Sequence, residues 1–441
     1  MGKEIGMGRI YYQVIDVTDF GPYVTKLVLG LPAEVRAEDV APEQFNVYVE
    51  VLSWQGEVVP IPKDFLTQDE FIPSRAFRPV TRAYPSTRTG EPLDRGVYIT
   101  LEMPYGPIYS CSSTLVADVE DLNGHEYYAF SNYRITQITP IGGEHPMQGL
   151  VFDTCAGVFN PKRDRFLEDI SSDPKIPMRY GYYLPRIGRG KRPLIIFLHG
   201  AGEGGTDTAI AYSGNKVTSF TDPDKQEIFG GATVLVPQCE TMWLDDGSHT
   251  YGAEGVEGLA RFSGRSMYTE ALKSLIDEFI EKYRDIIDTN RIYVGGDSNG
   301  GFMTMRMIMS YPDFFAAAFP ICEAMPDIRV SGEDIEHLKR LPIWFTHGKH
   351  DPVVAPEDFA LPTYQRLIRA GAQNVHLTLL EEIRDIHEGF KNEKGEPYRY
   401  FDHFAWIPVL NNDCVLDYDG TPVTVNGAVT PIMNWLALQS R

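Results

Sequence analysis

The chain has 441 residues, and its 40 basic and 61 acidic residues give it a formal net charge of −21. This excess of negative charge argues against a nucleic-acid binder, which would present a basic face to the phosphates. The hydrophobic content of 43% is ample for real cores, and no run approaches the ~18 consecutive apolar residues of a membrane span.

The cysteines argue against a disulfide framework. They are odd in number, widely spaced and without a C-x-x-C pair. They are Cys111, Cys155, Cys239, Cys322 and Cys414. The N-terminal residues contain no apolar signal core. We therefore expect a cytoplasmic protein, or a secreted one if an export signal has been removed.

Residues 1–145 are predicted to form an all-β domain. Short runs rich in β-branched and aromatic residues occur at 10–17, 23–29, 45–51, 97–101 and 127–139. Turn residues separate these runs, and no long helical period occurs, which is typical of an immunoglobulin-like β-sandwich. The sequence predicts a packing or assembly role for this domain, such as formation of a homo-oligomer, and its aromatic residues leave glycan binding open.

The length of the chain exceeds one typical domain, and a Gly/Pro-bearing segment at 141–149 suggests the linker. We place the boundary at 145 and expect residues 150–177 to be irregular. From Met178 the pattern changes to alternating strands and helices.

Residues 146–441 are predicted to form an α/β domain with a doubly wound, mostly parallel sheet. Continuous apolar runs typical of parallel strands buried on both faces occur at 193–198 and 232–236. Further strands are predicted at 292–294, 316–322, 341–346 and 375–380. Residues 271–283 carry apolar side chains on one helical face. Ligands of such sheets bind at the carboxyl ends of the strands.

The centre of this domain is the stretch Gly296-Asp-Ser298-Asn-Gly300, which fits G-x-S-x-G. An apolar strand precedes it and a run of helix formers follows it. This is the context of a nucleophile elbow, in which a serine at a tight turn is exposed above the sheet. The sequence therefore predicts Ser298 as a nucleophile.

A serine nucleophile needs a histidine base and an acid that orients this base. Asp351 follows the strand at 341–346, where an orienting acid belongs. Of the histidines downstream of Asp351, His376 lies inside a predicted strand. His387 and His403 both remain candidates for the base, and the aromatic neighbours of His403 could wall a pocket.

The oxyanion hole needs two backbone amides. The first is expected from Asn299, the residue after the nucleophile. The second is expected from Ala201, in the Gly-rich loop that follows the strand at 193–198. His199 in the same loop is predicted to be a structural anchor rather than a base.

Two other patterns are weaker. Gly200, Gly202 and Gly205 match G-x-G-x-x-G, but no helix starts directly after them and no strand ends in an acidic residue at the distance that dinucleotide binding requires. His347, His350 and Asp351 could suggest a metal site, but no further Cys or His clusters with them. We expect no cofactor and no metal.

Residues 178–406 resemble the α/β-hydrolase esterases of the phospholipase/carboxylesterase type, near the prolyl-oligopeptidase-like esterases. The matching pieces are residues 198–204, 236–239 with Trp243, 290–294, the Ser298 turn, 311–314, 319–322 and 347–351. The N-terminal domain looks like the immunoglobulin-like domain that precedes some of these esterases.

The resemblance implies a triad of Ser298, Asp351 and His403 and an oxyanion hole formed by the amides of Ala201 and Asn299. Asn299 stands where many relatives carry Met or Gln. A polar stretch at 388–399 lies between the acid and the histidine.

The sequence as a whole predicts a serine hydrolase of carboxylic esters, acting on short-chain or aryl small-molecule substrates. We further expect residues 240–265 to form a cap over the acyl pocket, with Trp243, Tyr251 and Phe262, and Trp243 to bind the substrate. The alternatives are a serine peptidase of the same fold and a non-catalytic binding or scaffold protein.

Overall fold

The computed structural model describes residues 10–53, 55–59, 61–62, 71–118, 121, 124–142, 146–186, 190–248 and 263–441. The contacts within the chain divide it into two compact units. The first comprises Met1–Ala117 and Tyr127–Asp164, and the second comprises Asp118–Glu126 and Arg165–Arg441. A short excursion from the first part of the chain therefore belongs to the second unit.

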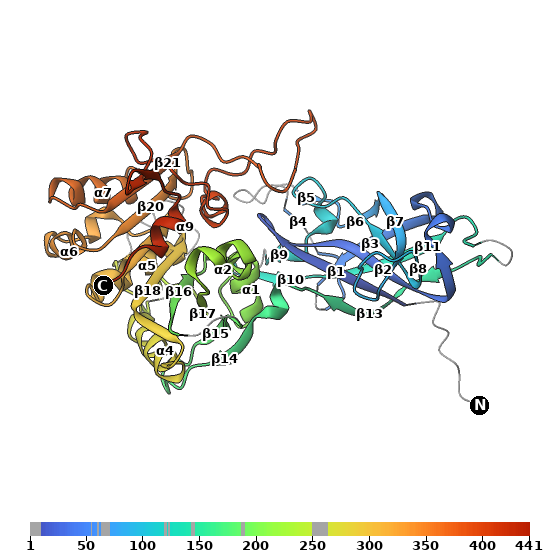
Figure 1. Cartoon of the computed structure of the whole chain (residues 1–441), viewed down its shortest axis with the longest axis horizontal. Coiled ribbons are helices and arrows are strands. Elements are labelled where there is room, and N and C mark those ends of the chain that lie inside the picture. The colour runs from blue at the N-terminus through green and yellow to red at the C-terminus, as the bar shows by residue number, and fades with distance from the viewer. Residues whose placement is uncertain are drawn as a thin grey trace. The chain divides into compact units, whose positions relative to one another are not determined.

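The first unit consists of two β-sheets (Figure 1). The five-stranded sheet has the order β13 (Thr154–Phe159), β1 (Ile10–Thr18), β2 (Gly21–Arg36), β8 (Arg95–Glu102) and β7 (Arg82–Ser86). The four-stranded sheet has the order β12 (Val151–Phe152), β11 (Phe130–Gln137), β3 (Phe45–Leu52) and β6 (Arg75–Arg78). Two short pairs accompany them, formed by β4 (Ile61–Pro62) with β5 (Phe71–Ile72) and by β9 (Leu115–Ala117) with β10 (Glu126–Tyr128).

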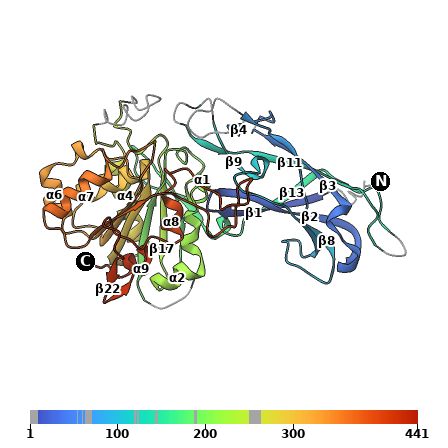
Figure 2. The same ribbon diagram turned by 90° about the horizontal axis from the view of Figure 1, so that it is seen from above.

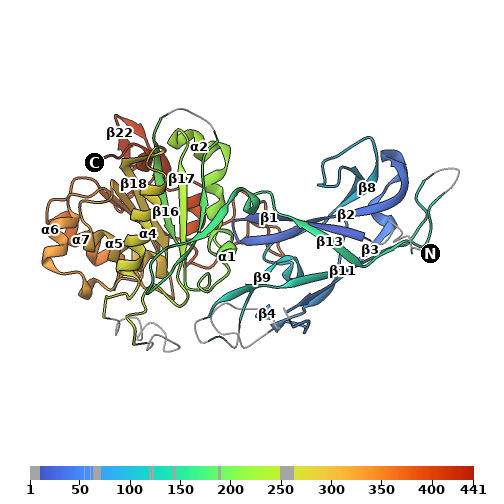
Figure 3. The same ribbon diagram turned by 90° about the horizontal axis from the view of Figure 1, so that it is seen from below.

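The two sheets lie face to face (Figure 3). They enclose one hydrophobic core, because alternate residues of their strands are buried. In β11 and β3 buried and more exposed residues alternate along the whole strand. Tyr11 of one sheet meets Tyr133 of the other edge to face at 6.1 Å, and its hydroxyl accepts a hydrogen bond from the amide of Tyr133. The prediction of an all-β, immunoglobulin-like first domain is confirmed.

The structure contains strands where the sequence predicted irregular chain. β13 lies beyond the expected boundary at 145 and pairs in parallel with β1, at the edge of the five-stranded sheet. β14 (Leu167–Ile170) also lies in this segment and is the edge strand of the second unit. Along the chain, the first unit ends at Asp164 and the long segment of the second unit begins at Arg165.

The second unit is built on one eight-stranded sheet. Its order is β14, β15 (Arg179–Tyr183), β17 (Thr233–Gln238), β16 (Arg192–Leu198), β18 (Ile287–Asp297), β19 (Ala317–Ile321), β20 (Ile343–Gly348) and β21 (Val375–Leu380). The strands from β17 to β21 are parallel, and β14 and β15 are antiparallel to their neighbours. The prediction of a mostly parallel, doubly wound sheet is confirmed.

Helices cover both faces of this sheet (Figure 2). One face carries α4 (Thr269–Lys282), α5 (Asn299–Ser310), α6 (Gly332–Leu338) and α7 (Ala360–Arg369). The other carries α1 (Thr208–Ser213), α2 (Pro223–Phe229), α8 (Trp406–Leu410) and α9 (Ile432–Ala437), and a short hairpin joins β22 (Thr424–Val425) to β23 (Ala428–Val429). Because both faces are covered, the central strands are buried along nearly their whole length. In the described residues, no helix is long and apolar enough to cross a membrane.

Candidate active site

Ser298 lies at the turn between β18 and α5, with φ 53° and ψ −115°. Positive φ is costly for a residue with a side chain, and such strain is concentrated at functional sites. The amide of Ser298 donates to the carbonyl of Ile321 at 2.9 Å, which ties the turn to the neighbouring strand β19. The strand, turn and helix predicted around Ser298 are all present.

The glycines on either side of Ser298 are required by packing. A Cβ atom on Gly300 would lie 1.9 Å from the carbonyl oxygen of Leu198, and one on Gly296 would lie 2.3 Å from the same atom. The turn and the start of α5 therefore press directly against the end of β16. This contact places Ser298 beside the loop that follows β16.

Asp351 and His403 are joined by a hydrogen bond of 2.6 Å between Oδ2 and Nδ1. The other carboxylate oxygen of Asp351 accepts from the amides of Val353 at 2.8 Å and Val354 at 3.0 Å. A Cβ atom on Gly348 would lie 1.9 Å from the carbonyl oxygen of Asp402, so the loop with His403 packs tightly on the end of β20. Backbone contacts thus fix the positions of both Asp351 and His403.

The charge of Asp351 is stabilised in the folded protein. Burial alone would raise its pKa, but His403 and His347 hold this pKa well below its ordinary value. Nε2 of His347 lies 3.3 Å from Oδ2 of Asp351 and 2.8 Å from the carbonyl oxygen of Val354. An ionised Asp351 favours a proton on Nδ1 of His403, which leaves Nε2 free to accept a proton.

The loop after β16 is held by His199. Nδ1 of His199 lies 2.6 Å from the carbonyl oxygen of Gly200, and Nε2 accepts from the amide of Cys239 at 3.2 Å. Burial lowers the pKa of His199 to about 4, so the ring is neutral at pH 7. These contacts give His199 the anchoring position that the sequence predicts.

Trp243 and Asn299 lie on the inner side of this loop. Trp243 is 0% exposed, and its indole N–H donates to the carbonyl of His199 at 3.1 Å. The side-chain oxygen of Asn299 accepts from the amide of Leu244 at 3.1 Å. Asn299 is the first residue of α5, where backbone amides have no acceptor inside the helix. Trp243 supports the loop from within the core, whereas Tyr251 and Phe262 lie outside the described residues.

Three carboxyl groups that the sequence analysis did not single out gather behind the same loop: Glu126, Glu203 and Asp297. A Cβ atom on Gly200 would lie 2.8 Å from Oδ2 of Asp297 and 2.9 Å from Oε2 of Glu203. Asn215 donates to the same oxygen of Asp297 at 2.9 Å. The amide of Glu126 donates to the carbonyl of Gly202 at 2.7 Å.

These carboxyl groups have raised pKa values, so they hold protons closer to neutral pH than ordinary carboxyl groups do. Burial raises the pKa of Asp297 to about 7, with His403 opposing the shift, and burial raises that of Glu126 to about 7. Burial, together with the charges of Asp297 and Glu126, raises the pKa of Glu203 well above its ordinary value. A protonated cluster places less negative charge beside the loop than an ionised one would.

Each histidine downstream of Asp351 contacts a different aspartate. His376 pairs with Asp417 at 2.6 Å, and His387 pairs with Asp413 at 2.9 Å on a partly exposed surface. Among the described residues, His403 is therefore the downstream histidine that contacts Asp351. His350 is exposed and lies 3.9 Å from Glu381. Within the described ranges, no group of three or more His, Cys, Asp or Glu could hold a metal ion.

Known families match both parts of the chain. Residues 11–144 match the esterase Ig-like N-terminal domain, and residues 188–388 match the phospholipase/carboxylesterase family. A solved structure of a thermostable esterase is 25% identical, with a TM-score of 0.70 over 98% of this chain and 99% of that chain.

Two curated proteins match shorter stretches. The chain is 31% identical over 137 residues to poly(3-hydroxyalkanoate) depolymerase C of Paucimonas lemoignei, and 31% identical over 139 residues to feruloyl esterase B of Neurospora crassa. These matches cover 29% and 31% of this chain and 27% and 40% of the relatives, so the chain spans less than half of their length. The chain therefore joins a domain of the esterase Ig-like N-terminal family to an α/β-hydrolase domain of the phospholipase/carboxylesterase family.

Proposed function

We propose that the protein is a serine hydrolase of carboxylic esters, with Ser298, His403 and Asp351 as its triad. The observation that carries the proposal is the 2.6 Å bond between His403 and a buried, ionised Asp351 in a sheet whose nucleophile turn holds Ser298 at positive φ. These three residues all follow or lie beyond carboxyl ends of parallel strands, where this class of sheet binds ligands.

The reaction follows from these positions. Nε2 of His403 takes the proton of the Ser298 hydroxyl as the oxygen attacks the ester carbonyl. The amides of Ala201 and Asn299 stabilise the oxyanion that forms. His403 returns the proton to the leaving alcohol, and water, activated by the same ring, then hydrolyses the acyl-enzyme.

The names of the two curated relatives, a depolymerase of a polyester and a feruloyl esterase, support an ester rather than a peptide substrate. We propose short-chain or aryl acyl groups. A serine peptidase of the same fold is the second candidate, and a binding protein without activity is the third.

The test is hydrolysis of p-nitrophenyl esters of increasing acyl length, with peptide p-nitroanilides in parallel. The wild type should cleave short esters and leave the anilides intact. Ser298→Ala and His403→Ala should lose at least about a thousandfold in kcat, whereas His387→Ala should stay within a factor of two. If His387→Ala lost activity and His403→Ala kept it, His387 rather than His403 would be the catalytic base. Cleavage of the anilides without a preference for esters would favour a serine peptidase.

A further inference from the structure

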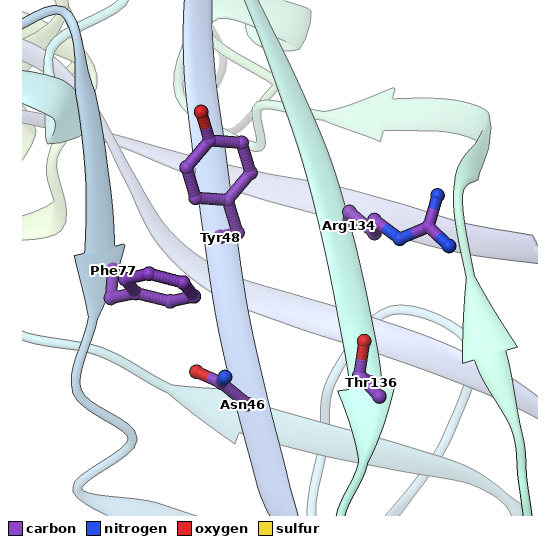
Figure 4. A pocket seen from close by; sticks show the side chains of 5 residues that line it. All are labelled: Asn46, Tyr48, Phe77, Arg134 and Thr136. Carbon is purple, nitrogen blue, oxygen red and sulfur yellow. The ribbon is translucent and has the colours of Figure 1, made fainter.

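The outer face of the four-stranded sheet in the first unit carries a cavity of about 370 Å³. The cavity is lined by Asn46, Tyr48, Phe77, Arg134 and Thr136. Figure 4 shows these side chains on one face of three adjacent strands, with the rings of Tyr48 and Phe77 beside each other. The volume lies at the small end of the range for small-molecule sites.

Strand register aligns three of these residues in one row across the sheet. Arg134 of β11 is opposite Tyr48 of β3, and Tyr48 is opposite Phe77 of β6. Thr136 and Asn46 form the next row on the same face. Because neighbouring strands are about 4.8 Å apart, the first row extends over roughly 10 Å. This length suits two linked sugar rings better than a single small ligand.

The aromatic part of the row is exposed, and its two rings lie against each other. Phe77 is 67% exposed, and its ring lies 5.3 Å from that of Tyr48, centre to centre. The hydroxyl of Tyr48 donates to Glu50 at 3.1 Å, and Glu50 also pairs with Arg75 at 3.1 Å. The exposed ring of Phe77, beside a tyrosine whose hydroxyl is hydrogen-bonded, can bind a flat apolar surface.

The charge in the row is not neutralised. Among the described residues, Arg134 has no ion-pair partner, although the chain has a net charge of −21. A guanidinium binds a carboxylate through two parallel hydrogen bonds. The amide of Asn46 and the hydroxyl of Thr136 add neutral donors and acceptors beside it.

We propose that this face of the first unit binds an oligosaccharide that carries a uronic acid, with sugar rings on Phe77 and Tyr48 and the carboxylate on Arg134. A sugar ring presents an apolar C–H face and a polar edge, which matches the aromatic row and its polar neighbours. A uronic acid adds the carboxylate that Arg134 lacks. This binding is separate from ester hydrolysis and does not depend on the proposed triad.

The test uses the full chain and two ligands that differ in one group: xylotetraose and xylotetraose substituted with glucuronic acid. Neither ligand contains a carboxylic ester, so the proposed hydrolase activity does not consume them. Isothermal titration calorimetry should show binding of the acidic ligand that is about tenfold tighter than that of the neutral one. Arg134→Gln should remove this difference. Phe77→Ala should weaken both ligands about five- to tenfold.

The matched control is Phe130→Ala. Phe130 is an aromatic residue of β11 that is 61% exposed, but it does not line the cavity. This variant should bind both ligands as the parent does. Each substitution, introduced into the active protein, should leave p-nitrophenyl ester hydrolysis unchanged, which shows that the chain is folded.

Three results would overturn the proposal. The first is no binding of the acidic ligand by the parent. The second is equal binding in the parent, Phe77→Ala and Arg134→Gln. The third is a fall in molecular mass in Phe77→Ala, measured by sedimentation, because the face would then join copies of the chain.

Discussion

Arg78 of the first unit and the carboxyl cluster of the second unit are buried in opposite ways. In the first unit, Arg78 is 6% exposed and donates to the Tyr133 hydroxyl at 2.5 Å and to the carbonyls of Val24 at 3.0 Å and Pro104 at 2.7 Å. In the second unit, Oε2 of Glu203 and Oδ1 of Asp297 are buried without a hydrogen-bond partner among the described residues.

The two arrangements have opposite consequences for the stability of the fold. A buried charge that is satisfied by fixed acceptors ties strands together, which is the ordinary fate of buried polar groups. A carboxyl oxygen that is buried without a partner weakens the fold, and perturbed pKa values of this kind gather at functional sites. Asp351 in the same unit is satisfied by two histidines and two amides, so its pKa moves in the opposite direction.

The largest expected effect is on catalysis by Asp351→Asn. An amide in this position no longer stabilises the protonated ring of His403, and kcat should fall roughly a thousandfold or more, with little change in KM. The control is Asp413→Asn, which removes the partner of His387 and should keep kcat within a factor of two. Equal losses in both variants would contradict the assignment.

The next effect is on the stability of the nucleophile turn. Gly300→Ala places a Cβ atom 1.9 Å from the backbone of Leu198 and should lower the free energy of unfolding by about 3 kcal/mol or more. Gly332→Ala, where no atom lies within 4 Å of the added Cβ, should be neutral or slightly stabilising. Urea denaturation of both variants measures this difference; similar values would show that the turn can relax.

In the first unit, Arg78→Met should destabilise the protein by about 2–3 kcal/mol, because the acceptors around the guanidinium lose their donor. The loss should be equal at pH 5 and pH 8, since arginine stays charged at both. Arg82→Met removes an exposed partner of Glu102 and should cost less than about 0.5 kcal/mol. If the loss of stability in Arg78→Met depended on pH, Arg78 would not differ from the carboxyl cluster of the second unit in the way described.

Glu203→Gln should have the smallest effect. It should change how the stability of the protein depends on pH. The folded pKa of Glu203 is raised, so between about pH 4.5 and this pKa the folded state holds a proton that the unfolded state has released. Stability therefore falls as pH rises through this range. The variant lacks this contribution and should gain roughly 1–2 kcal/mol relative to the wild type between pH 4.5 and pH 8.

Thermal unfolding across this pH range measures the effect. Glu393→Gln, at an exposed position, should follow the wild-type curve. A Glu203→Gln curve parallel to that of the wild type would show that the carboxyl group ionises freely in the folded protein.

The parts of the molecule that follow from local pattern could be predicted from the sequence. The strand before Ser298 and the helix after it are marked by an apolar run, by glycines and by helix formers within a few residues. The central strands are continuous apolar runs because both faces of the sheet are covered. The acid at Asp351 could be placed because it directly follows such a strand.

The remaining features depend on contacts between distant segments. β13 pairs with β1 about 140 residues earlier in the chain, and its exposed residues show no alternation that marks a strand. Glu126 contacts the loop at Gly202 from the segment Asp118–Glu126, which lies in the chain between two stretches of the first unit. The residue pattern could not decide whether His387 or His403 pairs with Asp351, because only tertiary packing brings one of them to this aspartate.

The most direct test of the proposed mechanism is labelling of the active protein with a fluorophosphonate, followed by peptide mass spectrometry. The account predicts one adduct, on Ser298, that forms at the rate at which ester hydrolysis is lost. The same adduct should form at least about a hundredfold more slowly in His403→Ala and at the wild-type rate in His387→Ala. An adduct on another residue, or full loss of activity without an adduct on Ser298, would contradict the account.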